Sequence, residues 1–343
     1  TIKKVGAIMA DKFGQFFKDT LKEILVEHVK ELKNQSEIDK FYEKYEKADF
    51  SFLFLEMIND TSNQMVRDAK MIMHENTLLF RGEETEIIAR IEQKWSNAFA
   101  TSETMYMMVL ESVKDYSDYV NKIDNKEREK SIHKYTALKY IHGRGLQQFL
   151  EIITLMKNGF ADGAYSRWRS LYELNIIASF ISEYGEEVAE AYISSHNTED
   201  RYEWARACGE FSPKKRYISF DDIRKKSNFP SELWQQPYRI SNEVTHASSQ
   251  GTFNRLGLMD GEEKISVGHT DYGLTIPGEH SAITIAQLTG LLLMVYPSGD
   301  SIIAAKMLNK WIDVVREQYF KTHDYIFPDE PKLWNNEKNL SLR

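Results

Sequence analysis

Two short segments of the sequence carry side chains that suit chemistry on a phosphodiester. The first contains Arg169 and Glu173, which lie four residues apart and therefore share one face of a helix. The second contains Arg239 and His246, which share a helix face about 10 Å apart along its axis. A histidine can transfer protons near neutral pH, and an arginine can bind a phosphate through two hydrogen bonds. These four residues are the candidate catalytic residues.

Each segment also has a purely structural interpretation. Arg169 and Glu173 belong to a helix that is apolar nearly all round, so we expect them to be buried and paired. A buried ion pair is not clearly more stable than an apolar pair, so a role in fixing helix register and a role in function both stay open. His246 could equally be a hydrogen-bonded histidine of the core, with Arg239 as a surface charge.

Other polar residues near the second segment are candidates for substrate binding. These are Tyr238, Ser241 and Asn242, together with the basic cluster Lys214, Lys215 and Arg216. A further basic cluster spans 224–226, and both clusters could hold an RNA backbone or remain solvated loops. His142 and Arg144, in a preceding helix, are weaker candidates for the same cleft.

Other familiar sites are missing or incomplete. The sequence has no phosphate-binding loop of the form GxxxxGK[ST], and Gly143-Arg144-Gly145 lacks the third glycine of a dinucleotide fingerprint. His269, Asp271 and His280 do not have the spacing of a standard metal site. We therefore expect neither a cofactor nor a metal.

The elements that must position these residues are predicted to be helices. The first 212 residues of the 343-residue chain contain no proline, which favours long helices and argues against a β-sandwich. Apolar spacings of three and four residues predict a series of helices, with breaks at Asn34 and Gly82 and a loop or small hairpin at 251–280. The expected ranges are 6–32, 37–47, 50–80, 83–123, 131–157, 161–183, 186–209, 231–248, 278–296 and 299–322.

The polar run 124–130 is the expected domain boundary, although it could also be a solvated turn in one body. It divides a helical N-terminal region, 1–130, from a helical bundle, 131–325, and a polar tail, 326–343. The N-terminal region could be a cap, a sensor or a dimerisation element.

The composition limits the class of protein. A net charge of −8 argues against a general nucleic-acid coat, since phosphate binding needs basic surface. The single cysteine, Cys208, rules out an intrachain disulfide and fits a reducing cytosol. The longest apolar stretch, 282–296, is too short to span a bilayer. We expect a soluble cytoplasmic protein without a membrane segment.

The Arg169/Glu173 helix and the segment from Tyr238 to His246 together resemble an uncharacterised bacterial helical domain family that is similar to the HEPN superfamily. The resemblance covers residues 131–260 and leaves the first 130 residues outside it. It implies an all-α, HEPN-like helical bundle that forms a homodimer. Active HEPN proteins cut RNA without metal: the 2′-hydroxyl attacks the adjacent phosphate and leaves a cyclic phosphate end.

Carried over, the resemblance implies that Arg239 holds the phosphate and His246 acts as acid or base. Ile240 follows Arg239, where a polar residue is usual, so Arg169 is an alternative phosphate ligand with Glu173 orienting it or His246. Many such proteins are toxins or antiphage defence effectors, and others have lost catalysis.

Three interpretations of function follow. The first is a metal-independent ribonuclease, and the second is a non-catalytic interaction module whose N-terminal helices bind a regulatory partner. The third is a nucleotide-binding regulator, which needs a phosphate-sized pocket beside Arg169 or Arg239. A closed, buried cluster would favour the module, whereas a solvent-open cleft with basic rims would favour the nuclease.

Overall fold

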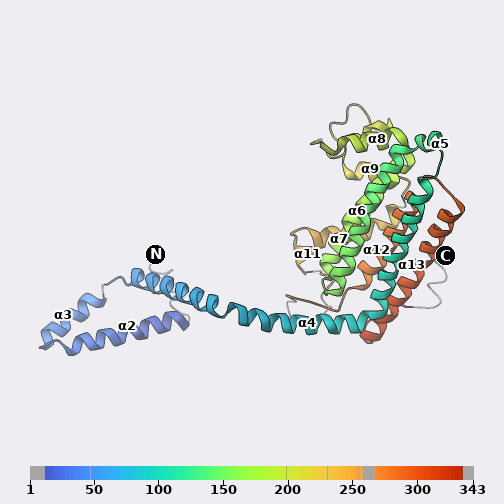
Figure 1. Cartoon of the computed structure of the whole chain (residues 1–343). Helices are drawn as coiled ribbons and strands as arrows, with labels where there is room; N and C mark the ends of the chain where they lie inside the picture. Colours follow the sequence, from blue (N-terminus) through green and yellow to red (C-terminus); the bar gives the residue numbers. More distant parts are fainter. Residues whose placement is uncertain are drawn as a thin grey trace. The chain divides into compact units, whose positions relative to one another are not determined.

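The computed structural model describes residues 12–46, 48–197, 199–229, 231–253, 255–257 and 267–334 (Figure 1). Every regular element within these ranges is a helix, so the all-α class is confirmed. The longer helices are α2 (Lys12–Lys30), α3 (Gln35–Glu46), α4 (Ser51–Val120), α6 (Ile132–Lys157), α7 (Ala161–Tyr184), α10 (Ser231–Thr245), α12 (Thr275–Leu293) and α13 (Gly299–Ile326). The shorter ones are α5 (Asn125–Glu129), α8 (Glu186–Ser194), α9 (Phe220–Lys226), α11 (Ser249–Phe253) and the 3-10 helices η1 (Ser195–Asn197) and η2 (Glu203–Cys208).

The chain forms two compact units, 1–83 and 84–343. The boundary therefore lies earlier in the chain than the polar run 124–130, which was the place expected from composition. In the structure this run contains the short helix α5, whose N-terminus is capped by Asp124. The Tyr296 hydroxyl donates a 2.5 Å hydrogen bond to the carbonyl oxygen of Arg128, which ties the run to the second unit.

The long helix α4 shows that Gly82 does not interrupt the helical pattern, contrary to the prediction. A glycine inside a helix costs about 1 kcal/mol relative to alanine, which a long helix can tolerate. A helix normally ends where a cap or a turn replaces its next hydrogen bond, and Gly82 has helical residues on both sides. The predicted helices 50–80 and 83–123 are therefore one helix.

The described part of the first unit contains a helical hairpin and the beginning of α4. Asn34 marks the predicted break, since its side-chain oxygen accepts a 3.0 Å hydrogen bond from the backbone N–H of Glu37. Phe54 of α4 is buried between Phe13 and Phe17 of α2, with ring centroids 5.8 and 5.0 Å away. This small aromatic cluster holds the beginning of α4 against α2.

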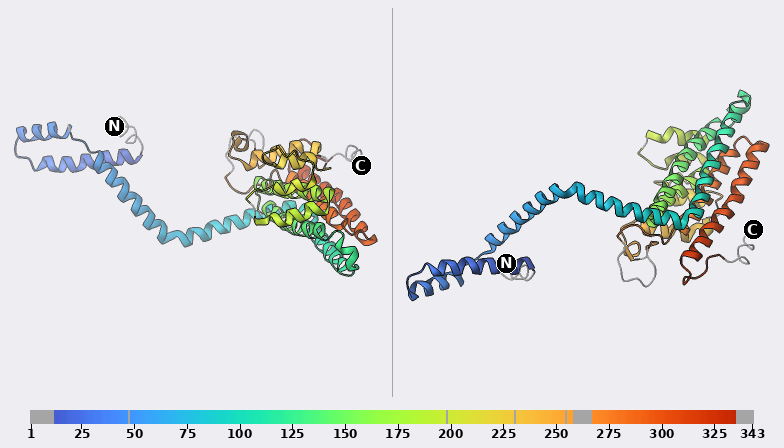
Figure 2. Two further views of the ribbon diagram at one scale, coloured as in Figure 1. Left: turned by 90° about the horizontal axis from the view of Figure 1, so that it is seen from above. Right: turned by 60° about the horizontal axis from the view of Figure 1, so that its bottom comes forward.

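The second unit has its core among α6, α7, α12, α13 and the C-terminal part of α4, which lie side by side in the views of Figures 1 and 2. The central helix α7 is apolar nearly all round, as its sequence predicts, and it buries Trp168, Leu171 and Ile181 completely. The α4 segment is joined to α13 by a 3.0 Å hydrogen bond between the hydroxyls of Ser102 and Tyr319. The core thus holds α7 in place between its neighbouring helices.

Glycines end two of these helices where the sequence predicts. Gly159 and Gly185 follow α6 and α7 with φ values of 70° and 83°, a left-handed conformation that favours glycine. Gly159 also approaches the backbone of Thr270 closely, so a side chain there would meet that loop.

Between α7 and α12 the structure is less regular than the sequence suggests. The predicted helix 186–209 is instead α8 followed by η1 and η2. The Ser195 hydroxyl donates to the carbonyl oxygen of Tyr192, and such side-chain bonds compete with the helical hydrogen bonds. The predicted loop 251–280 contains the end of α11 and the start of α12, and its segment 258–266 lies outside the described residues.

Within the described residues, no helix combines the length and the apolar character that crossing a membrane requires. Cys208 is partly buried against the core and forms no disulfide.

Candidate functional site

The structure brings Arg169 of α7 into contact with His246, which follows α10. The Nη1 atom of Arg169 lies 3.3 Å from the Nε2 atom of His246. An arginine side chain has only hydrogen-bond donors, so Nε2 of His246 is the acceptor in this contact. His246 is exposed and the Arg169 side chain is 23% exposed, so both can reach a ligand from solvent. They were expected to converge, but Arg169 is less buried than its helix suggests.

Glu173 and Tyr238 hold the arginine from the other side. The Nε atom of Arg169 lies 3.2 Å from Oε1 of Glu173, although its N–H is not aimed well enough to make a hydrogen bond. The Tyr238 hydroxyl donates a 3.0 Å hydrogen bond to the same oxygen. The guanidinium also lies over the Tyr238 ring, 5.6 Å from its centroid. Arg169 is therefore confined by an ion pair and an aromatic face.

Tyr238 stays protonated at neutral pH and so remains a donor. Burial is the main reason that its pKa rises to about 12, and the Glu173 carboxylate raises it further. A second guanidinium, from Arg224, lies 5.9 Å from the same ring centroid. Arg224 is paired with Asp221 at 2.5 Å, so its charge is partly neutralised.

Several contacts fix α10 against α7 and thereby set the geometry of the site. The Tyr165 hydroxyl donates a 3.2 Å hydrogen bond to the carbonyl oxygen of Pro237 in α10. The Thr245 hydroxyl donates at 3.1 Å to the hydroxyl of Ser166. The Tyr172 and Tyr238 rings also pack together, with centroids 5.3 Å apart. These bonds lie on both sides of the Arg169 turn, so the two helices meet in one register.

The structure does not bring Arg239 to this cluster. Its side chain is 71% exposed, and its Nε atom lies 3.8 Å from Oε1 of Glu243, one turn along α10. Ser241 is buried, and its hydroxyl donates to the carbonyl oxygen of Tyr238, which is a local helix contact. The Oδ1 atom of Asn242 is buried without a hydrogen-bond partner among the described residues. None of these three side chains contacts Arg169 or His246 in the described interactions.

The predicted basic cluster at 214–216 has mixed surroundings. Lys214 and Arg216 are exposed, whereas Lys215 forms a 2.7 Å ion pair with Asp222. The hydrogen bond from Lys215 is the largest cause that lowers the pKa of Asp222 to about 2. In the second cluster, Lys226 pairs with Glu210 at 3.1 Å. Much of this basic charge is thus neutralised locally.

A pocket of about 210 Å³ lies beside Glu173. Its lining includes the cations Arg144 and Arg201 and the rings of Tyr192 and Tyr202. The sequence pattern did not single out Arg201 or Tyr202, because they lie in the irregular segment before η2. Of the two weaker candidates in α6, Arg144 lines this pocket and His142 does not.

His142 instead lies in the core. Its Nε2 atom is 3.0 Å from the Thr289 hydroxyl, and burial lowers its pKa to about 4. The other three candidates also have separate partners. His269 contacts Asn158 and Glu84, Asp271 pairs with Lys94, and His280 contacts Tyr165. In the part of the chain that the structure describes, no three His, Cys, Asp or Glu side chains are grouped as a metal site.

Comparison with known proteins gives one match. A family described as "Family of unknown function (DUF5677)" matches residues 135–207. The matched segment runs from α6 into η2, so it includes Arg169 and Glu173 but ends before Tyr238 and His246. Neither the curated proteins nor the solved structures gave a match to the chain.

Proposed function

We propose that the chain is a metal-independent endoribonuclease of the HEPN type. The observation that carries the proposal is the 3.3 Å contact between Arg169 and His246, with the histidine open to solvent. An imidazole beside a confined guanidinium is suited to cut an RNA phosphodiester, because the reaction needs one base and one fixed positive charge. The resemblance to HEPN proteins supports the same reaction and a role as a toxin or antiphage defence effector.

In the proposed reaction, the Nε2 atom of His246 takes the proton of a ribose 2′-hydroxyl. The oxygen attacks the adjacent phosphorus, and the bond from phosphorus to the 5′ oxygen breaks. The products are a 2′,3′-cyclic phosphate and a 5′-hydroxyl whose proton comes from solvent. Arg169 stabilises the negative charge that develops on the phosphate oxygens. Glu173 and Tyr238 act as positioning residues, since they hold Arg169 in place.

Arg169 takes the phosphate-binding role in preference to Arg239 in this proposal. The reason is geometric: Arg169 contacts His246, whereas Arg239 is exposed and lies near Glu243. Two cations, Arg144 and Arg201, line the pocket beside Glu173. Their positive charge attracts a polyanion to a chain that is acidic as a whole.

A homodimer is part of the proposal, and α4 of the first unit supports it. Between residues 65 and 80 this helix carries two adjacent apolar rows whose members recur every seven residues. The side chains are 46% to 66% exposed, far more than large apolar residues usually are in contiguous rows. The rows are Met65, Ile72 and Leu79, and Val66, Met73 and Phe80.

The test is an RNA cleavage assay in the presence of EDTA. Wild-type protein should cut RNA and leave 2′,3′-cyclic phosphate ends. His246→Ala and Arg169→Ala should each lower the rate by ~100-fold or more, since general base catalysis and charge stabilisation each contribute on that order. Arg239→Ala is the matched control and should keep most of the activity.

Two results would count against the proposal. If Arg239→Ala lost activity and Arg169→Ala kept it, the arginine assignment would be wrong. If wild-type protein bound several RNAs, tRNA included, but cut none of them, the chain would be a non-catalytic binding module. Circular dichroism of each variant checks that the bundle is intact.

A further inference from the structure

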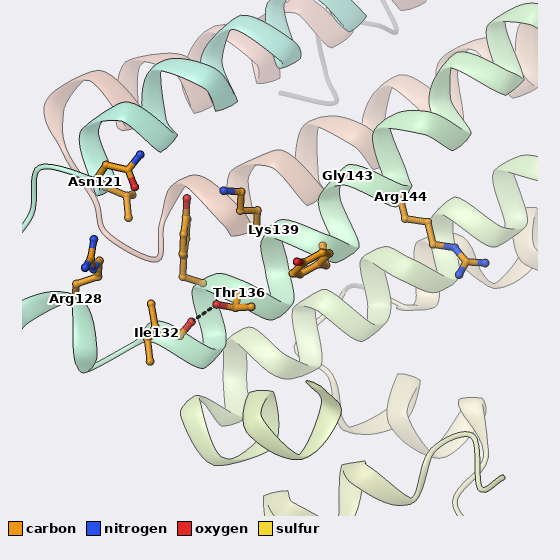
Figure 3. A pocket seen from close by; sticks show the side chains of 10 residues that line it. Asn121, Arg128, Ile132, Thr136, Lys139, Gly143 and Arg144 are labelled. Atoms are coloured by element: carbon orange, nitrogen blue, oxygen red, sulfur yellow. Dashed lines mark hydrogen bonds between the residues drawn. The ribbon is translucent and has the colours of Figure 1, made fainter. Parts of the chain in front are cut away.

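A second cleft lies on the outer face of α6, away from His246. It has a volume of about 630 Å³, within the range of ~300–1,000 Å³ that ligand sites usually have. Its walls come from the end of α4, from α5 and from successive turns of α6 (Figure 3). The lining residues that matter here are Arg128, Tyr135, Lys139, Tyr140 and Arg144.

The cleft is positively charged. Three cations line it, and no carboxylate is among its lining residues. Arg128 donates a 2.8 Å hydrogen bond to the neutral side-chain oxygen of Asn125, and Lys139 lies 5.6 Å from the centroid of the Tyr135 ring. In the described structure, neither Lys139 nor Arg144 forms an ion pair with an acidic side chain. A chain with net charge −8 thus keeps unneutralised cations together in one concave place, which fits an anionic ligand.

The cleft also offers an aromatic face. Tyr140 is 77% exposed, although it lies on a helix whose other large rings are buried. Phosphate-binding cations beside an exposed ring are the two components of single-strand nucleic-acid sites, where bases stack on aromatic side chains and the backbone follows a positive groove.

The cleft shares one lining residue with the pocket beside Glu173. Arg144 lines this cleft and also the smaller pocket beside Glu173. In Figure 3 it lies at the end of the row of labelled α6 residues, beyond Lys139 and Gly143. A strand bound along α6 would therefore pass from Arg128 past Lys139 to Arg144 and then reach the pocket that contains Glu173.

We infer that the α6 cleft binds single-stranded RNA as an extended subsite, with phosphates on Arg128, Lys139 and Arg144 and a base stacked on Tyr140. The inference rests on the proposed ribonuclease function for the identity of the ligand. It adds a second place where the strand is held.

The test measures equilibrium binding of a fluorescent 12-nucleotide RNA with 2′-O-methyl riboses, which cannot undergo the cleavage reaction. Fluorescence anisotropy is recorded over a series of salt concentrations. Lys139→Ala should reduce the slope of log K against log salt by about 0.7, the value for one phosphate contact with a single strand. Tyr140→Ala should weaken binding by about 5-fold or more with little change in slope, because it removes a stacked base.

Each of the two test variants has a matched control. Tyr140→Phe retains the ring and should bind as wild type does. Lys310→Ala removes an exposed lysine of α13, outside the cleft, and should leave both affinity and slope unchanged. The methylated RNA reports binding without cleavage, so a failure of the nuclease proposal does not decide the outcome here.

Three results would overturn the inference. The first is wild-type binding by both Lys139→Ala and Tyr140→Ala. The second is a slope change that is as large for Lys310→Ala as for Lys139→Ala. The third is AMP that binds as tightly as the oligonucleotide with the same response to the variants, which would make the cleft a site for a free nucleotide.

Discussion

Two histidines of the second unit, the buried His142 and the partly buried His280, lie where charge is disfavoured. Burial lowers the pKa of both His142 and His280 to about 4, and the positive charge of Arg316 adds to the effect for His280. His142 bonds to the Thr289 hydroxyl, and His280 bonds to the Tyr165 hydroxyl beside the aromatic cluster of α7. In an unfolded chain both would titrate near 6.5.

The difference predicts that acid destabilises the second unit. Below pH 6.5 these histidines become protonated in the unfolded chain, whereas in the folded chain they stay neutral until about pH 4. The free energy of unfolding therefore falls as the pH falls through this window. Between pH 7 and pH 5 each histidine should cost roughly 2 kcal/mol of unfolding free energy. Urea denaturation of His142→Gln at the two pH values should show about that much less pH dependence than wild type.

The exposed His196 provides the control. His196→Gln should keep the wild-type difference between pH 7 and pH 5. If His142→Gln kept it as well, His142 would not be the neutral, buried group that its surroundings imply.

At the site, the sequence identified the residue types but not which arginine is used. The contact face of α10 follows Trp234, Tyr238 and Ser241, which recur every three or four residues and are buried or partly buried. Arg239 is offset from that face by one residue, about 100° around the helix, so it points outward. That spacing was available in the sequence. The pairing of Arg169 with His246 could be expected only as an alternative, because it depends on how α7 and α10 pack.

At the scale of elements, α12 and α13 approach each other closely at Gly278. A Cβ atom at this position would overlap the ring of Tyr319, which is completely buried. Gly290, three turns further along α12, has no neighbouring atom within 4 Å of the place where a Cβ would be. The two glycines therefore have different reasons to be glycine.

Gly278→Ala should destabilise the second unit by about 1–3 kcal/mol, since it overfills a packed core. Gly290→Ala should stabilise it by up to about 1 kcal/mol, since alanine is the better helix former and the space is open. Thermal unfolding followed by circular dichroism measures both. Equal effects of the two changes would show that α12 and α13 do not meet as closely as described.

The helices themselves were largely predictable, because their apolar spacing and their glycine caps are local signals. Helix α6 ends at Asn158 and Gly159, and α7 ends before Gly185, as the sequence indicates. The helix predictions were wrong where the same local sequence is compatible with two structures. Gly82 could be either a break or a tolerated helical residue, and the polar run after Ser194 could be either a surface helix or irregular structure.

At the scale of the whole molecule, the chain has two units with different surfaces. The second unit buries many large aromatic residues, among them Trp168 and Tyr319, in one core. In the first unit, α4 leaves apolar rows exposed, among them Ile72 and Leu79. Exposed apolar rows of this kind mark interaction surfaces, and a second copy of the chain is the partner that we propose.

We therefore expect the 343-residue chain to be a dimer whose subunits separate when these rows are made charged. Ile72→Glu combined with Leu79→Glu should give a monomer in size-exclusion chromatography with light scattering. His74→Glu, on the opposite side of the same helical turn, should stay dimeric. A wild-type chain that is monomeric at all concentrations would contradict the expectation.

The contact between Arg169 and His246 also has a consequence for the protein before it meets a substrate. The arginine N–H occupies the lone pair that the histidine needs as a base. A phosphodiester that draws the guanidinium towards its own oxygens would free that lone pair in the same movement. In the proposed reaction, His246 is thus unable to act as a base until the phosphodiester to be cut has bound to Arg169.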